Sequence, residues 1–191
     1  NFMKIIHIHP LSSMAYNFIY PLMEEEKLLG HDTILIVFKN DSKKIPIINF
    51  DLRINNFSLL IEIVKLIFFL KKHKPNVIFC HNTTSSTVPL FCLKILKCEK
   101  IIYFNHGVPY LAYNGILRIL LYSMEYLNII LSDITITVSA SMKKKLDLIK
   151  PNTYLIHNGS ACGLDLNKKT IQAKVNKKKE IVVSYIGRLK N

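Results

Sequence analysis

Short apolar runs alternate with longer segments of helical periodicity along most of this 191-residue chain. The runs are rich in isoleucine, valine and phenylalanine, and they are continuous in apolar character, which is typical of strands buried on both faces of a parallel sheet. We therefore predict a doubly wound, mostly parallel, Rossmann-like α/β fold. The predicted strands are residues 4–9, 33–38, 77–80, 100–105, 134–138 and 153–156, and the predicted helices are residues 17–29, 58–72, 87–96, 115–131 and 140–148.

Local signals set several of these boundaries. Gly30 is expected just past the end of the first helix, where glycine commonly adopts a left-handed conformation. Ser58 is expected to cap its helix. Pro89 is expected in the first turn of its helix, because the amide proton that proline lacks is not needed there.

The charge of the chain is strongly positive, with 26 Lys and Arg against 13 Asp and Glu and a net charge of +13. Such an excess favours nucleic acids, anionic membrane surfaces or phosphorylated small molecules as partners. The lysines are scattered, with short runs at 143–145 and 177–179, and there is no tryptophan. This distribution disfavours a nucleic-acid partner, although a basic nucleic-acid-binding module and a non-catalytic interaction domain remain alternatives.

The cysteines and the most apolar segments point to the cytoplasm. Cys80, Cys92, Cys98 and Cys162 form no C-x-x-C pair, so we expect small buried thiols and no metal site. Charged residues interrupt the apolar stretches 59–70 and 116–131, and neither reaches the length of a membrane span. The lysines that follow residue 70 leave open a peripheral contact with an anionic membrane, whereas the apolar face of that helix is expected to pack on the sheet.

Ligands of open α/β sheets bind outside the carboxyl ends of the strands, and polar residues follow several of the predicted strands. His106 and Gly107 are the strongest candidates, because histidine can donate or accept hydrogen bonds near neutral pH and glycine permits close approach of a ligand. The other candidates at these ends are Ser12, Ser13, His81, Asn82, Asn105, Tyr110 and Ser139.

Two serines and three histidines have competing interpretations. Ser12 and Ser13 could cap a helix or could face a phosphate or sugar. His81 could belong to a loop that only caps a helix. His7, inside the first strand, is expected to be a packing residue, and the role of His9 is open. The sequence has no G-x-G-x-x-G, P-loop, G-x-S-x-G or H-E-x-x-H motif.

Several short motifs, in the right order along essentially the whole chain, resemble the family-4 retaining glycosyltransferases. They are the opening strand, Asn105-His106-Gly107, the strand end at 137–139, the Asn-Gly-Ser-x-x-Gly-Leu-Asp arrangement from Asn158, and the strand that leads into Gly187-Arg188-Leu189. The resemblance implies a GT-B fold, in which an N-terminal Rossmann-like domain holds the acceptor and a C-terminal one holds the nucleotide-sugar.

The resemblance also implies roles for individual residues. His106 matches the family histidine in the interdomain cleft that contacts the transferred sugar or positions the reacting centre. Arg188, with Gly187, matches the turn that grips the donor diphosphate. The implied donor is a UDP-sugar, without a metal or other cofactor, and the implied acceptor is a lipid-linked or saccharide glycan of bacterial surface-polysaccharide or glycoprotein synthesis. Such an enzyme is expected at the cytoplasmic face of the membrane.

We accordingly expect an acceptor domain over residues 1–157, a linker over 158–179, and the first strand and Gly-Arg turn of a donor domain over 180–191. The chain departs from the family in its first loop, where Pro10-Leu11-Ser12-Ser13 replaces the usual glycine-rich sequence. The family lysine and acidic pair of the donor domain would lie beyond Asn191. We therefore expect this polypeptide alone to bind nucleotide-sugar poorly and to have negligible transferase activity.

Overall fold

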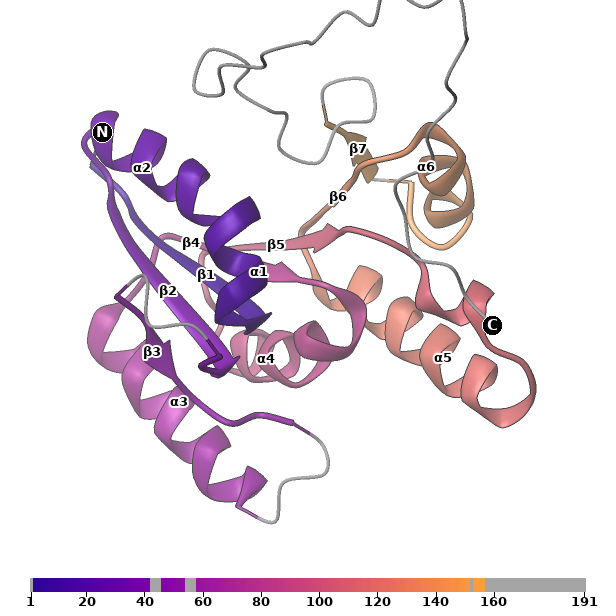
Figure 1. The fold of residues 1–191 in the computed structure, drawn as a ribbon, viewed down its shortest axis with the longest axis horizontal. Coiled ribbons are helices and arrows are strands. Elements are labelled where there is room, and N and C mark those ends of the chain that lie inside the picture. Colours follow the sequence, from indigo (N-terminus) through magenta and orange to yellow (C-terminus); the bar gives the residue numbers. More distant parts are fainter. Residues whose placement is uncertain (1, 42–45, 54–57, 152, 157–191) are drawn as a thin grey trace, which may run out of the picture.

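The computed structural model describes residues 2–41, 46–53, 58–151 and 153–156. Within this part of the chain, seven strands form one sheet in the order β3-β2-β1-β4-β5-β6-β7, and every neighbouring pair is parallel (Figure 1). This confirms the predicted doubly wound, Rossmann-like α/β fold. The strands are β1 (Lys4–Leu11), β2 (Asp32–Lys39), β3 (Ile48–Asn49), β4 (Val77–His81), β5 (Lys100–Asn105), β6 (Ile134–Thr137) and β7 (Thr153–Leu155).

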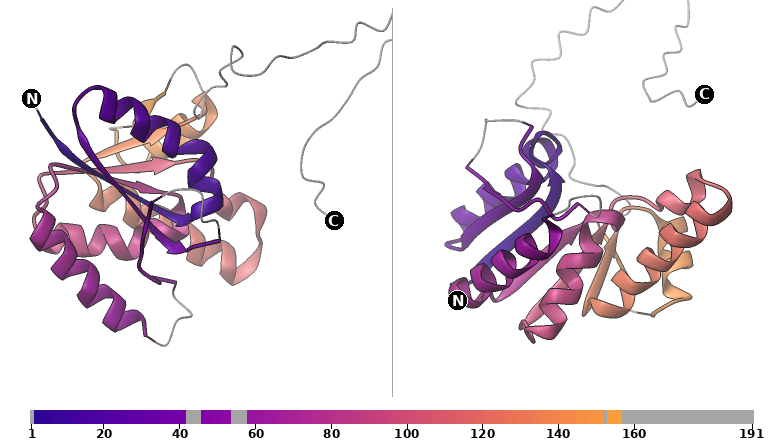
Figure 2. Two further views of the ribbon diagram at one scale, coloured as in Figure 1. Left: turned by 60° about the vertical axis from the view of Figure 1, so that its left-hand side comes forward. Right: turned by 90° about the horizontal axis from the view of Figure 1, so that it is seen from below.

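Helices cover both faces of the sheet. Helices α1 (Ser12–Phe18) and α2 (Tyr20–Leu28) lie on one face, over β1 and β2. Helices α3 (Leu59–His73), α4 (Thr83–Ile95) and α5 (Gly115–Leu131) lie on the other (Figures 1 and 2). The remaining described elements are the 3₁₀ helix η1 (Pro109–Ala112) and α6 (Ala140–Asp147), whose Leu146 belongs to the main hydrophobic core.

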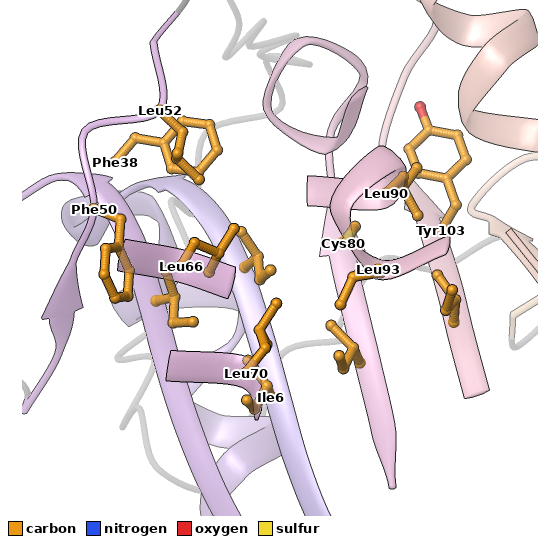
Figure 3. Close-up of a cluster of buried hydrophobic side chains, with 14 of the residues drawn as sticks. Ile6, Phe38, Phe50, Leu52, Leu66, Leu70, Cys80, Leu90, Leu93 and Tyr103 are labelled. Atoms are coloured by element: carbon orange, nitrogen blue, oxygen red, sulfur yellow. The ribbon is translucent and has the colours of Figure 1, made fainter. Parts of the chain in front are cut away.

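The main hydrophobic core lies between the sheet and the layer that contains α3 and α4. Leu66 and Leu70 of α3 and Leu90 and Leu93 of α4 pack there, and Ile6 of β1 is among the strand residues that they meet (Figure 3). Because side chains alternate across a strand, Ile6 and Ile8 point into this core while His7 and His9 point to the face covered by α1 and α2. The thiols of the described cysteines are free, and Cys80 and Cys92 are buried as expected.

The sequence predicted most element boundaries closely. The strand at 100–105 and the helix at 115–131 are confirmed residue for residue, and most other ends differ by one or two residues. Gly30 has φ of +85°, as expected for a residue just past a helix end. The predicted linker at 158–179, and the strand with Gly187 and Arg188, lie outside the described residues.

Two helix predictions were wrong at their starts. The helix predicted at 17–29 is two helices, the first of which already begins at Ser12, and the break falls where Pro21 removes an amide donor from the first turn of α2. Helix α4 begins at Thr83, so Pro89 lies in its interior. The polar run that resembled a loop is helical, and its hydroxyls bond to carbonyls four residues back, as Ser85 does to His81 and Ser86 to Asn82.

A buried polar network lies beside the core, between β5, α4 and α5. The wholly buried Glu125 of α5 accepts hydrogen bonds from Thr83 Oγ1 at 2.7 Å, from Asn105 Nδ2 at 2.6 Å and from the Tyr103 hydroxyl at 3.1 Å. Burial raises the pKa of Glu125, and the donors act in the opposite direction. This carboxyl group therefore ties α5 to β5 and to the start of α4 through groups that have no access to water.

We expect Glu125→Ala to lower the free energy of unfolding by about 2–4 kcal/mol, because it leaves several buried donors unpaired. Chemical denaturation measures the effect. The matched control is Glu24→Ala on α2, where the side chain is 47% exposed and pairs with Lys27, and its effect should be within about 0.5 kcal/mol. Equal denaturation midpoints for Glu125→Ala and the wild-type chain would show that the network does not stabilise the fold.

Candidate functional site

The candidate site lies at the carboxyl ends of β1, β4 and β5. The connection from β1 leads to β2 on one side, whereas β4 pairs with β1 on the other side, so the strand order reverses between β1 and β4. Open α/β sheets bind ligands outside the carboxyl ends at such a reversal. Four histidines gather here: His7 and His9 on β1, His81 at the end of β4, and His106 directly after β5.

Three of these histidines form a continuous chain of close contacts that ends on a carboxylate. Glu26 Oε2 of α2 lies 3.0 Å from His7 Nε2, and His7 Nδ1 lies 3.1 Å from His81 Nε2. His81 Nδ1 lies 3.1 Å from His106 Nε2. His7 and His81 are buried, and His106 is the partly exposed end of the chain. We call Glu26, His7, His81 and His106 the histidine chain.

Aromatic rings of the strands support the histidine chain. His7 stacks on Phe79 with ring centroids 4.8 Å apart and planes inclined by 6°. His106 stacks on Phe104 at 4.4 Å and 12°. These contacts hold the planes of both imidazoles, so the rings can turn little without losing their stacking partners.

Burial favours the neutral form of three histidines of the site, which are His9, His81 and His106. Burial lowers the pKa of His9 from 6.5 to about 4, although a hydrogen bond to Leu11 acts in the opposite direction. Burial also lowers the pKa of His106 from 6.5 to about 4, and repulsion from His9 adds to this shift. Burial also lowers the pKa of His81 well below its usual range, with repulsion from His7, His106 and His9 as smaller causes. Near neutral pH each of these three rings therefore has one N–H donor and one bare nitrogen acceptor.

His9 is held separately from the histidine chain. Its Nδ1 lies 2.9 Å from the Leu11 carbonyl oxygen, and its Nε2 lies 3.1 Å from Asn82 Nδ2. Asn82 has φ of +68° and ψ of 152°, a conformation rarely adopted by residues other than glycine. Backbone strain of this kind costs on the order of 1–3 kcal/mol and is common at binding sites, so Asn82 adds to the evidence for a site here.

Ser12 and Ser13 bind a carboxylate of the same chain. They are the first two residues of α1, and Asp41, beyond the end of β2, accepts hydrogen bonds from Ser12 Oγ at 2.8 Å, Ser13 Oγ at 2.7 Å and the Ser13 backbone N–H at 2.8 Å. The Ser13 hydrogen bonds are the main reason that the pKa of Asp41 is lowered to about 2. An internal anion thus occupies the position that a phosphate would take at this helix end.

The other predicted site residues lie outside the histidine chain. Asn105 is wholly buried on the opposite face of the sheet, in the network of Glu125. Tyr110 packs against Leu121 and Met124. Ser139 caps α6, where its side chain accepts a hydrogen bond from the Met142 backbone N–H.

Gly107 does not require the conformational freedom of glycine. Its φ is not positive, unlike that of Gly30 and Gly115. A Cβ atom at this position would meet nothing within 4 Å, so the space beside Gly107 is open.

Sequence analysis missed Glu26 and underestimated His7. Glu26 is the third residue in a Glu-Glu-Glu run, which is typical of a solvated helix face, and no local signal marks it as buried. A signal was available for His7, because the spacing of two residues places it on the same strand face as His9.

No metal-binding arrangement is present in the described ranges. The ring nitrogens of the histidine chain contact one another in sequence and do not converge on one point. No group of three or more His, Cys, Asp or Glu side chains in these ranges could hold an ion.

A groove of about 470 Å³ opens at the opposite edge of the sheet, near the start of β4 and β5. Lys71, Lys74, Lys97 and Glu99 are among the residues that line it. It contains none of the histidines, and it lies at the edge where open α/β sheets do not bind their ligands. We therefore place the candidate site at the histidine chain.

Comparisons with known proteins show similarity at the level of structure. No protein-family model and no curated protein sequence matches this chain. Among solved structures, S. aureus MnaA with UDP superimposes with a TM-score of 0.64 at 16% identity, over 82% of this chain and 44% of that one. The UDP-GlcNAc 2-epimerase of Methanocaldococcus jannaschii gives a TM-score of 0.63 at 16% identity, over 82% of this chain and 46% of that one.

A third similar structure is that of Anabaena HepE in complex with UDP and glucose, with a TM-score of 0.62 at 15% identity, over 86% of this chain and 46% of that one. The chain thus spans less than half the length of these proteins. At such identities the likeness shows the fold alone. It is a Rossmann-like, glycosyltransferase-like α/β fold, and the comparisons do not single out the family-4 enzymes.

Proposed function

We propose that this chain is the acceptor-side part of a retaining glycosyltransferase, which transfers a sugar from a nucleotide-sugar, UDP-linked, to a lipid-linked glycan. The fold supports the nucleotide-sugar, as do the ligands of similar structures, which are UDP, UDP-GlcNAc, and UDP with glucose. The product would be a bacterial surface polysaccharide or glycoprotein glycan. This finer assignment rests on the family-4 resemblance of the sequence motifs.

The observation that supports a lipid-linked acceptor best is an exposed apolar surface on the segment that follows His106 in the sequence. Helices η1 and α5 are the next two elements after His106, and the first turns of α5 are exposed to solvent, with Ile116 81% and Ile119 62% exposed. No acidic residue occurs between His106 and Met124. We call this surface the α5 patch, and its residues are Leu111, Tyr113, Ile116, Leu117, Ile119 and Leu120.

The α5 patch is suited to lie on a membrane surface. Fully burying one Leu or Ile side chain is worth about 1.5–3 kcal/mol. Arg118, within the patch sequence, would add about 1 kcal/mol beside anionic headgroups. None of the helices in the described residues combines the length and the apolar character of a bilayer span. A patch that rests on the bilayer would bring a lipid-linked sugar close to His106.

In this proposal His106 contacts the sugar that is transferred, and its neutral ring can accept a proton or a hydrogen bond there. Arg188 and Gly187 would hold the donor diphosphate, on which negative charge develops as the glycosidic bond breaks. Those two residues belong to the part of the chain for which the resemblance alone gives a role.

A second candidate function is epimerisation of a UDP-sugar, because several similar structures are named UDP-GlcNAc 2-epimerases. An epimerase acts on the nucleotide-sugar alone and needs no lipid-linked acceptor. The two candidates therefore differ in which ligand should bind beside His106.

We expect a soluble, short-chain prenyl-diphosphate-linked sugar to bind this chain more tightly than UDP-GlcNAc, as measured by isothermal titration calorimetry. His106→Gln should weaken this binding by roughly ten- to a hundredfold, because it removes a hydrogen bond in a partly buried site. His73→Gln, at the far end of α3, is the matched control and should bind like the wild type. Tighter binding of UDP-GlcNAc, with no binding of the prenyl compound, would favour the epimerase.

We expect the chain to bind vesicles that contain anionic phospholipid, as measured by flotation. The double variant Ile116→Ser with Ile119→Ser should lower the partition coefficient at least roughly tenfold, because it removes two apolar anchors. Leu28→Ser with Leu29→Ser is the control, since these residues are 80% and 75% exposed at the end of α2. Equal losses for the two double variants would show that the α5 patch has no special part in binding.

A further inference from the structure

With its three imidazoles neutral, the histidine chain has only two arrangements of its hydrogen atoms. A neutral imidazole has one N–H and one bare nitrogen, so it can donate at one end and accept at the other. Three contacts link the four groups: Glu26 to His7, His7 to His81, and His81 to His106. If every contact is a hydrogen bond, all donors point towards Glu26 or all point away from it.

Glu26 decides between these arrangements. An ionised carboxylate can only accept hydrogen bonds, so His7 must donate from Nε2. His7 Nδ1 is then bare and accepts from His81 Nε2–H. His81 Nδ1 is likewise bare and accepts from His106 Nε2–H. The remaining nitrogen of His106, Nδ1, is left as an acceptor.

We propose that Glu26 is a positioning residue that acts through His7 and His81 to fix the tautomer of His106, so that His106 presents a bare Nδ1 to the ligand. His7 and His81 are positioning residues of the same device. This role deepens the proposed function. The use of the tautomer in catalysis rests on that function, whereas the tautomer of His106 itself does not depend on it.

The burial and packing of the histidine chain support this role. The His7 side chain is wholly buried and that of Glu26 is 11% exposed, so water competes little for the contacts at that end. Stacking on Phe79 and Phe104 fixes the ring planes of His7 and His106. His9 lies beside His81, with ring centroids 6.0 Å apart, but its nitrogens contact Leu11 and Asn82 and not the histidine chain.

The arrangement has a consequence for the ligand. A bare Nδ1 accepts a hydrogen bond from a hydroxyl group, such as that of a sugar, and it offers nothing to an ionised phosphate oxygen, which is also an acceptor. His106 is therefore directed at a hydroxyl of the substrate.

The histidine chain can also move one proton. When a hydroxyl proton is transferred to His106 Nδ1, the Nε2 proton of His106 can pass to His81 Nδ1 and that of His81 to His7 Nδ1. The Nε2 proton of His7 then passes to Glu26. The three rings end as neutral imidazoles of the other tautomer, Glu26 ends as a carboxylic acid, and no imidazolium remains.

The test is the tautomer of each ring, read from the ¹⁵N chemical shifts of the histidine-labelled 191-residue chain at neutral pH. In the wild type we expect Nε2 protonated and Nδ1 bare in His7, His81 and His106. Glu26→Gln offers an amide that can donate as well as accept, so we expect the Nδ1–H form of His106 to rise from a trace to a major population. Glu24→Gln, on the exposed side of α2, should change nothing.

A His106 protonated at Nδ1 in the wild type would overturn the proposal. A doubly protonated His7 would also overturn it, because donor and acceptor would then be exchanged in the His7–His81 and His81–His106 hydrogen bonds. An unchanged His106 tautomer in a folded Glu26→Gln chain would also overturn it. The wild-type spectrum decides even if Glu26→Gln fails to fold. The tautomer measurement uses no ligand, so its result does not depend on the proposed function. If the tautomers are as expected but the calorimetric binding test of His106 fails, that failure would count against the proposed function alone.

Discussion

The architecture of this site depends on one constraint, which is that all strands of the sheet are parallel while their order reverses between β1 and β4. Parallel strands bring all their carboxyl ends to one edge, and the reversal leaves the space beyond β1 and β4 free of a crossing helix. Residues as distant in sequence as His7 and His81 are therefore in contact. The positions of the histidines follow from the direction and order of the strands.

Two buried polar systems occupy opposite faces of the sheet near this edge. On one face, Glu125 holds Asn105, Tyr103 and Thr83 and so fixes the end of β5 and the start of α4. On the other face, Glu26 holds His7 and through it His81 and His106. Asn105 and His106 are adjacent in sequence but belong to different systems, so the backbone between them is anchored from both sides. Buried networks of this kind are rigid when their members are paired.

The sequence was sufficient to predict the doubly wound fold class, because continuous apolar runs are a local signal. It was also sufficient to predict the sheet edge where the histidines meet, because His81 and His106 directly follow predicted strands. It was not sufficient to sort the residues at that edge. Asn105 looked like a ligand-binding residue, but strand alternation turns it into the core. Ser12 and Ser13 bind Asp41, which lies beyond a separate strand, and no local pattern shows such a contact. Glu26 is buried only because α2 packs over His7, which is a tertiary effect.

The central claim is that the sheet edge holds a chain of contacts through His7, His81 and His106, with a neutral His106 at its accessible end. The direct test is a histidine titration by NMR from neutral to acid pH, with the resonances assigned by single His→Gln variants. We expect His106 and His9 to titrate with midpoints near pH 4. Since the unfolded chain would bind these protons more tightly, stability should fall as the pH drops from about 6.5 towards that value. Midpoints of His106 and His9 at about 6.5, as in an unstructured peptide, would contradict the account.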